Sequence, residues 1–116
     1  MRVYGCKVAC SRREEPSVRS QLTLENEHGL DSLDTYSAFA ARVEQSRESL
    51  RDLLGSLQGE GARLVGYAAS SKGTVILNYC GIGPDLLEFV CDNTPSKEGL
   101  FTPGTHIPVV LSLIHI

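Results

Sequence analysis

The feature that most constrains this chain is a run of small residues, 66–74 (GYAASSKGT). The run begins inside an apolar segment, 63–69, which is typical of a strand buried on both faces of a parallel sheet. It ends inside a second segment, 72–79, whose β-branched side chains also suit a strand. The short connection and the strand expected after it favour a helix there. The sequence thus predicts a buried strand that turns directly into a helix.

The same alternation continues further along the chain. Residues 86–91 are predicted to form a second strand and residues 107–110 a third, with a loop rich in Pro and Gly between them. The order helix, strand, helix, strand, loop, strand is typical of a βαβ unit with a right-handed crossover. A chain of 116 residues has room for one small core. We therefore predict a Rossmann-like α/β domain with three layers and a mainly parallel sheet.

The first helix of this order is long and amphipathic. It is expected to begin at Asp34, a candidate N-cap, and to end at Gly59 or Gly61. Its apolar face consists of Phe39, Val43, Leu50, Leu54 and Leu57. Its opposite face is charged and consists of Arg42, Glu44, Arg47, Glu48, Arg51 and Asp52. We expect the charged face to be solvated.

The two ends of the chain show weaker patterns. Residues 2–9 are rich in small and β-branched side chains, which indicates a strand, and residues 11–29 form a connecting segment with at most a short helix within 18–28. The predicted organisation is therefore an N-terminal strand and connection in residues 1–33 and the Rossmann-like domain in residues 34–110. Residues 111–116 (LSLIHI) are expected to be a tail that is not native to the domain.

Charge and hydropathy exclude several classes of partner. The formal net charge is −3 and no stretch concentrates Lys or Arg, so we expect no binding to nucleic acid. No apolar run approaches about eighteen residues, so we expect no membrane span. The N-terminus has no secretory core, which suggests a cytoplasmic protein. Cys6 and Cys10 are closely spaced but lack a second ligand pair, so we expect reduced thiols and no metal.

The small-residue run is also a candidate phosphate site. Small side chains let a ligand approach the backbone, and the amides and dipole at a helix N-terminus attract an anion. Lys72 adds a full charge at the same place. The pattern is neither a dinucleotide G-x-G-x-x-G nor a P-loop, and a tight turn with glycine for steric reasons is the alternative.

Other polar residues are candidates on position alone, each with a structural alternative. Asp92 ends the second strand nineteen positions after Gly73, where Rossmann units place the acid that binds a ribose, but it also suits an Asx-turn before Asn93-Thr94-Pro95. Lys97 suits either a phosphate or solvent, and Asn78 either the turn backbone or the ligand. The candidate substrate-binding residues are Gly66, Ser70, Ser71, Lys72, Gly73, Asn78, Asp92, Thr105 and His106. No Ser-His-Asp set, paired carboxylate or metal cluster can be assembled, so we predict no catalytic residue.

Four ordered motifs carry a resemblance to a known family. They are residues 65–73 (VGYAASSKG), 77–83 (LNYCGIG), 92–99 (DNTPSKEG) and 102–108 (TPGTHIP). In these stretches, and more weakly in residues 2–4 and 30–40, the chain resembles the C-terminal domain of S-adenosylmethionine-dependent C-methyltransferases that act on nucleotide-linked 4-keto-deoxy sugars.

The resemblance implies that different parts of the complete enzyme bind different ligands. Such enzymes have an N-terminal zinc-binding segment and a middle domain that holds S-adenosylmethionine, while the C-terminal domain helps to enclose the nucleotide-diphosphate sugar. It implies a role for Ser70, Ser71, Lys72 and Gly73 at the pyrophosphate, and for Asp92 or Thr105-His106 nearer the nucleotide. No cofactor is expected in this chain, its partner is the missing methyltransferase domain, and the chain alone is expected to be inactive.

The sequence departs from the family pattern at its end. After Val109 such domains continue with another helix and strand, so this domain is expected to be cut short at its C-terminus. A free-standing Rossmann-like module that binds NAD or coenzyme A is the alternative function. A domain that binds no nucleotide and serves only interaction is the third.

Overall fold

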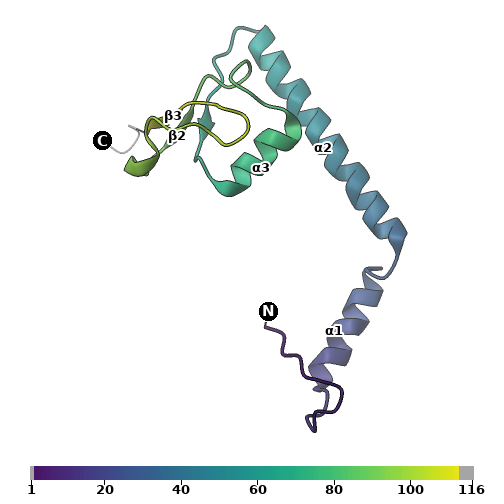
Figure 1. Ribbon diagram of the computed structural model, residues 1–116. Helices are drawn as coiled ribbons and strands as arrows, with labels where there is room; N and C mark the ends of the chain where they lie inside the picture. The colour runs from purple at the N-terminus through teal and green to yellow at the C-terminus, as the bar shows by residue number, and fades with distance from the viewer. Residues whose placement is uncertain (1, 113–116) are drawn as a thin grey trace. The chain divides into compact units, whose positions relative to one another are not determined.

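The computed structural model describes residues 2–112 and contains three α-helices, three short strands and one 3-10 helix (Figure 1). The elements are α1 (Pro16–Glu27), α2 (Leu33–Gly59), β1 (Gly66–Tyr67), α3 (Ser71–Cys80), β2 (Val90–Asp92), η1 (Pro95–Lys97) and β3 (Val109–Leu111). The chain divides within α2 into two compact units, residues 1–40 and residues 41–116. The second unit contains the complete sheet.

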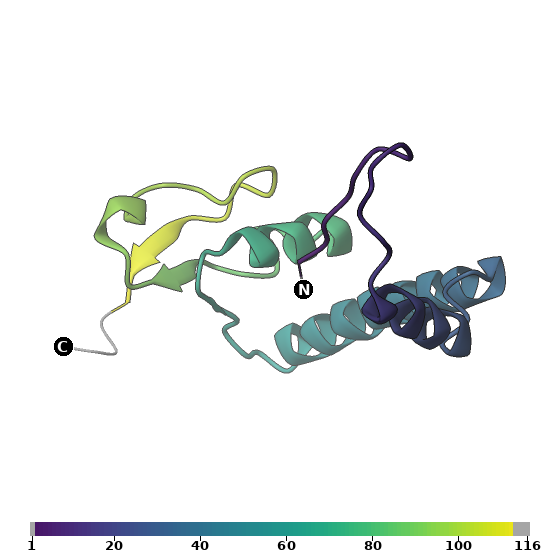
Figure 2. The ribbon, with the colours of Figure 1, turned by 90° about the horizontal axis from the view of Figure 1, so that it is seen from below.

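The three strands form one parallel sheet in the order β1-β2-β3. Gly66 is opposite Val90, and Val90 is opposite Val109. Figure 2 shows β2 and β3 side by side. Helix α3 connects the parallel strands β1 and β2, which is the βαβ arrangement predicted from the sequence. The prediction of a Rossmann-like α/β fold with a parallel sheet is confirmed.

The core of this unit is small. Its buried residues are Cys80, Ile82, Leu87, Val90 and Ile107. Leu50 and Leu54, two members of the predicted apolar face of α2, pack against it. Phe39, another member of that face, is exposed. Both leucines lie in the C-terminal half of α2, so the predicted apolar face contributes to the core of this unit.

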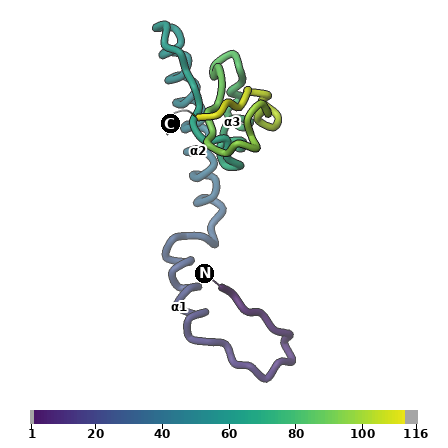
Figure 3. Tube along the Cα trace, turned by 90° about the vertical axis from the view of Figure 1, so that its left-hand side faces the viewer, coloured from purple at the N-terminus to yellow at the C-terminus, as the bar shows by residue number. Residues whose placement is uncertain are grey.

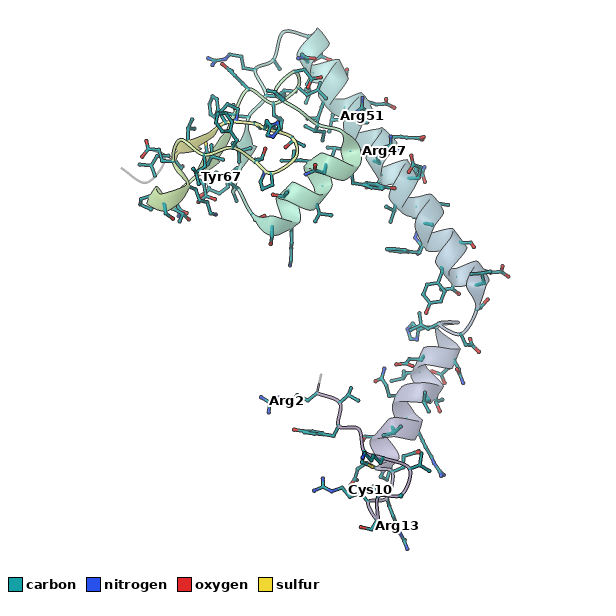
Figure 4. The ribbon with its side chains drawn as sticks, viewed as in Figure 1. Arg2, Cys10, Arg13, Arg47, Arg51 and Tyr67 are labelled. Carbon is teal, nitrogen blue, oxygen red and sulfur yellow. The ribbon has the colours of Figure 1, made fainter. Side chains whose placement is uncertain are left out.

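The charged face of α2 is expected to be solvated, and three of its residues, although still partly or fully exposed, also contact α3. Arg51 Nη1 donates hydrogen bonds to the carbonyl oxygens of Cys80 (2.6 Å) and Gly81 (3.0 Å) at the C-terminus of α3. A cation there complements the helix dipole. Arg47, labelled with Arg51 in Figure 4, lies over the ring of Tyr79 at 5.7 Å from its centroid.

The third of these residues, Glu44, also binds α3. Its Oε2 accepts a hydrogen bond from the Tyr79 hydroxyl (2.9 Å), which raises the pKa of Tyr79, and its Oε1 pairs with Arg47. The charged side chains therefore join two helices, because α3 ends against the polar flank of α2 rather than against its apolar stripe.

The N-terminal expectations need two corrections. Residues 2–9 contain no strand, because a strand needs a neighbouring strand for its hydrogen bonds and the first unit contains only helical elements among its described residues. The connecting segment contains the 12-residue helix α1, longer than the short helix expected within 18–28. Pro16 stands in the first turn of α1, where a missing N–H has no cost.

The strands are shorter than predicted and their bounds differ. Strand β2 begins later than the predicted residue 86 and includes Asp92. Strand β3 includes Leu111, and the Ser112 N–H donates to the Asp92 carbonyl (2.8 Å), so the expected domain end after Val110 falls inside a strand. Residues 113–116 of the expected tail lie outside the described residues. Among the helices of residues 2–112, none has the length and apolar character needed to span a bilayer.

Candidate functional site

The turn from β1 into α3 is the predicted strand-to-helix turn. Ala68 has φ +70°, a left-handed conformation that a side chain disfavours by about 1–2 kcal/mol. Such strain persists only where the surroundings enforce it, and it is common at functional sites. The next residues return to ordinary geometry, and Ser70 is extended with φ −100° and ψ 159°. The turn therefore has a fixed, strained conformation.

Ser70 is the N-cap of α3. Its Oγ accepts a hydrogen bond from the Gly73 N–H (3.1 Å), and its carbonyl accepts one from the Thr74 N–H (2.9 Å). The first bond satisfies one of the amides that a helix N-terminus leaves free, and the second is the first backbone bond of the helix itself. The N–H groups of Ser71 and Lys72 have no acceptor within the helix, so they are available to an anion.

An ion pair between the buried Asp92 and the half-buried Lys97 holds the turn. Asp92 Oδ2 accepts hydrogen bonds from the Ala69 N–H (2.8 Å) and from Lys97 Nζ (2.8 Å). Lys97 Nζ also donates to the Ala69 carbonyl (2.9 Å). The two side chains thus bind both sides of Ala69, which lies between the strained Ala68 and the cap Ser70. We call Asp92 and Lys97 the clamp pair.

The second oxygen of Asp92 is also engaged. Its Oδ1 accepts from the Thr94 N–H (2.8 Å), which is the Asx-turn that the sequence offered as the alternative. The Lys97 ammonium, the hydroxyl and N–H of Thr94 and the Ala69 N–H together hold the pKa of Asp92 well below its ordinary value, although burial opposes this. Asp92 is therefore an ionised, buried acceptor whose known partners all belong to the protein.

The two lysines near the turn differ in their availability. Lys97 is neutralised by Asp92. Lys72 is exposed in the first turn of α3 and makes no ion pair within residues 2–112. The exposed positive charge beside this turn is therefore that of Lys72, and its contact with a phosphate stays a prediction.

A cavity of about 130 Å³ lies at the turn. Three of the predicted residues, Gly66, Ser70 and Gly73, line it. Its other lining residues are mostly apolar: Tyr67, Ala68, Ala69, Thr74, Ile76, Leu77, Leu87, Val90 and Thr102. A Cβ atom added to Gly66 would lie 3.0 Å from Val90 Cγ2, so Gly66 lets β1 approach β2. The other predicted residues do not line the cavity.

Asn78 contacts backbone groups. Its Nδ2 donates to the Thr74 carbonyl (2.8 Å) and to the Pro103 carbonyl (2.9 Å), which joins α3 to the loop before β3. Figure 3 traces the backbone of this unit from α3, in green, to the yellow end of the described residues. Gly104 in that loop has φ +81°, and a Cβ there would lie 2.1 Å from Asn78 Oδ1. Only glycine fits this approach.

Thr105 and His106 belong to the same loop. The Thr105 hydroxyl shares a hydrogen bond with that of Thr102 (2.7 Å), and the His106 N–H donates to the Thr102 carbonyl (2.9 Å). His106 itself is exposed and has φ +55°. The loop therefore holds the imidazole on the surface, and its ligand contact stays a prediction.

Thr102 lies at the cavity but is not among the site residues predicted from the sequence. It is buried, lines the cavity, and its Oγ1 accepts from the Ile107 N–H (2.9 Å). The signal was present, because Thr102 opens one of the four family motifs. The clamp role of Lys97 had no signal, since a loop lysine five residues after an acid is common on protein surfaces.

The groups that the turn presents among the described residues are suited to binding a ligand. Among residues 2–112 no three His, Cys, Asp or Glu side chains are grouped to hold a metal ion. The features at the turn are free amides, one free ammonium and a mainly apolar cavity. This arrangement suits an anionic ligand with an uncharged part.

Comparison with known proteins places the chain in a family. The sequence model of the C-methyltransferase C-terminal domain matches residues 1–113. C-methyltransferase NovU of Streptomyces niveus is 33% identical over 107 residues, which are 92% of this chain and 26% of that protein. The chain thus spans about a quarter of the length of this relative. The chain belongs to the family of C-methyltransferase C-terminal domains, as the four motifs predicted.

Proposed function

We propose that this domain binds a nucleotide-diphosphate sugar for a C-methyltransferase and performs no chemistry itself. The diphosphate lies at the N-terminus of α3, and the complete protein transfers a methyl group from S-adenosylmethionine to a carbon of a nucleotide-linked 4-keto-deoxy sugar. The observation that carries the proposal is the free Lys72 ammonium beside the free amides of Ser71 and Lys72.

The clamp pair supports this location of the diphosphate. A second lysine, Lys97, stands near the turn, but its charge is balanced by Asp92. The ion pair keeps the amides pointing in a fixed direction without adding net charge to the site. The attraction for phosphate therefore comes from α3 and from Lys72.

The size of the cavity suits only one part of the proposed ligand, so the binding site would be shared with another part of the complete protein. Pockets for ligands of drug size have volumes of about 300–1,000 Å³, and the cavity at the turn has about 130 Å³. It has room for one part of a nucleotide-diphosphate sugar. The remaining surface of the ligand must be covered by another part of the protein, which agrees with a relative of which the matched residues are only 26%.

Asp92 also bears on the alternative function. A module that binds NAD in the usual Rossmann manner uses the acid after the second strand to accept hydrogen bonds from the ribose. Here the Ala69 N–H, the Thr94 N–H and the Lys97 ammonium already donate to that acid. No observation favours NAD or coenzyme A, so they serve as competitors in the test.

The cofactors belong to other parts of the complete protein in this proposal. S-adenosylmethionine is held by the methyltransferase domain and zinc by a separate segment, as the family resemblance implies. Residues of this chain bind and position the substrate. The turn and Lys72 hold the diphosphate, and Thr105 and His106 lie nearer the nucleotide.

Isothermal titration calorimetry tests the proposal. The purified chain is titrated separately with a thymidine-diphosphate sugar, NAD and coenzyme A. We expect binding of the sugar nucleotide and clearly weaker binding of the other two. Preferred binding of NAD or coenzyme A, or turnover of S-adenosylmethionine with a 4-keto sugar nucleotide by the chain alone, would contradict the proposal.

A further inference from the structure

One face of α2 is apolar along almost the whole helix. Its residues recur at alternating spacings of three and four positions, so they lie in one row on the helix surface. We call this row the α2 seam. The seam consists of Leu33, Tyr36, Ala40, Val43, Arg47, Leu50, Leu54 and Leu57, of which only Arg47 is charged.

The two halves of the α2 seam differ in exposure. In the C-terminal half, Leu50 and Leu54 pack against the core of the second unit. In the N-terminal half, Leu33 and Tyr36 are 78% and 52% exposed, and Ala40 is also exposed. The same apolar row therefore covers the core at one end of the helix and is open at the other. We call Leu33, Tyr36 and Ala40 the open half of the seam.

The first unit has no core of its own among its described residues. None of residues 2–40 is buried. Helix α1 has 12 residues, and isolated helices shorter than about 12–15 residues are marginal in water. Its apolar residues Val18, Leu22 and Leu24 are 43%, 51% and 48% exposed. Helices of this kind gain their stability mainly by packing against another surface.

We propose that the open half of the α2 seam is the surface on which the rest of the complete C-methyltransferase packs. The family model matches residues 1–113, so the first unit belongs to the family's domain. The matched residues are only 26% of C-methyltransferase NovU, so most of that relative lies outside the match. The proposal rests on membership of the family and is independent of the proposed sugar-nucleotide site.

The small size of the open half favours a tethered partner over a second copy of this chain. It has three residues on about two turns of helix, whereas stable interfaces between separate proteins use about 20–30 residues a side. A domain of the same polypeptide is present at an effective concentration of about a millimolar, so a smaller contact is sufficient. Because the three residues carry no charge, the facing surface is apolar.

Hydrogen–deuterium exchange tests the proposal. In a fusion protein, this chain replaces the matched residues of C-methyltransferase NovU, and its amide exchange is compared with that of the isolated chain. We expect exchange in residues 33–43 to be about ten-fold or more slower in the fusion protein, because packing on the seam suppresses local opening. Residues 50–57, where the seam already covers the core, should exchange at the same rate in both proteins.

The variants Ala40→Glu and Ala38→Glu provide a matched comparison. Both replace an exposed alanine of α2, but Ala40 lies on the seam and Ala38 lies on the opposite side of the helix. Both should retain the melting temperature of the isolated chain. In the fusion protein, only Ala40→Glu should restore the fast exchange of residues 33–43. Equal exchange of this segment in the native fusion protein and the isolated chain, or equal effects of the two variants, would overturn the proposal.

Sedimentation velocity of the isolated chain separates a tethered partner from a second copy and does not depend on the fusion protein. We expect a monomer at micromolar concentrations, because the open half is too small to hold two chains together. A dimer that Ala40→Glu dissociates and Ala38→Glu does not would show that a second copy covers the seam, and would overturn the proposal.

Discussion

Substitutions at Ser70 can separate the stability of α3 from binding at its N-terminus. Ser70 caps the helix through its Oγ, which accepts from the Gly73 N–H at 3.1 Å. Asp and Asn are caps of similar strength to Ser, whereas Ala costs about 0.5–2 kcal/mol. We therefore expect Ser70→Asp and Ser70→Asn to retain the melting temperature. Ser70→Ala should lower it by about 4–8 °C for each kcal/mol lost.

The effect on binding should be different. Ser70→Asp introduces a negative charge beside the proposed diphosphate, whereas Ser70→Asn does not. Two like charges at about 4 Å repel by about 1 kcal/mol in water and by about 4 kcal/mol near a protein surface. At 1.4 kcal/mol per decade, the dissociation constant should rise about five- to a thousand-fold in Ser70→Asp. Ser70→Asn should bind nearly as tightly as the native chain.

Calorimetry with a thymidine-diphosphate sugar and a thermal melt of each variant give both readouts. The comparison of Asp with Asn removes any effect of side-chain size, because the two are isosteric. Equal affinities of Ser70→Asp and Ser70→Asn for the sugar nucleotide would show that no phosphate lies at this helix end, and would refute the reasoning.

Further predictions concern Lys72 and the clamp pair. Lys72→Ala should weaken sugar-nucleotide binding about ten- to a hundred-fold in calorimetry, since a charge-assisted bond is lost, while the melting temperature stays the same. A lower melting temperature with unchanged affinity would instead make the loop a structural turn. Lys97→Met should lower the melting temperature, because it leaves the buried Asp92 carboxylate without its cation, whereas Lys72→Met should not; equal melting curves would exclude a clamp. The folded-state pKa of Asp92 is depressed, so its stabilisation is full above its unfolded pKa of about 3.9 and is lost as the pH falls below that value. The melting temperature of Asp92→Asn should therefore decrease less between pH 7 and pH 3 than that of the native chain, and parallel curves would contradict this assignment.

The sequence predicts the structure best where the local preferences of the residues agree with their tertiary environment. The small residues at 66–74 predicted a strand, a turn and a helix, and β1 and α3 occupy these positions. The prediction succeeded because glycine, a capping serine and the apolar flanks all specify the same turn. The four motifs predicted the family for the same region.

The errors arose where a residue depends on a distant partner. The hydrogen bonds of Arg51 could not be predicted because its acceptors, the carbonyls of Cys80 and Gly81, lie about thirty positions away in the sequence. The β-branched residues near the N-terminus suggested a strand, but propensity cannot supply the neighbouring strand that a ladder requires. Lys97 was assigned to phosphate or solvent, and only the fold shows that it binds Asp92 and the Ala69 carbonyl.

The most direct test of the central claim is an amide nitrogen–proton NMR titration of the isotopically labelled chain with a thymidine-diphosphate sugar. In the proposed complex the diphosphate binds the free amides of Ser71 and Lys72. We therefore expect the largest shifts at these two amides and at neighbouring amides of residues 66–74, with smaller shifts near Thr105 and His106. Shifts confined to other parts of the chain, or no shifts at millimolar ligand, would contradict it.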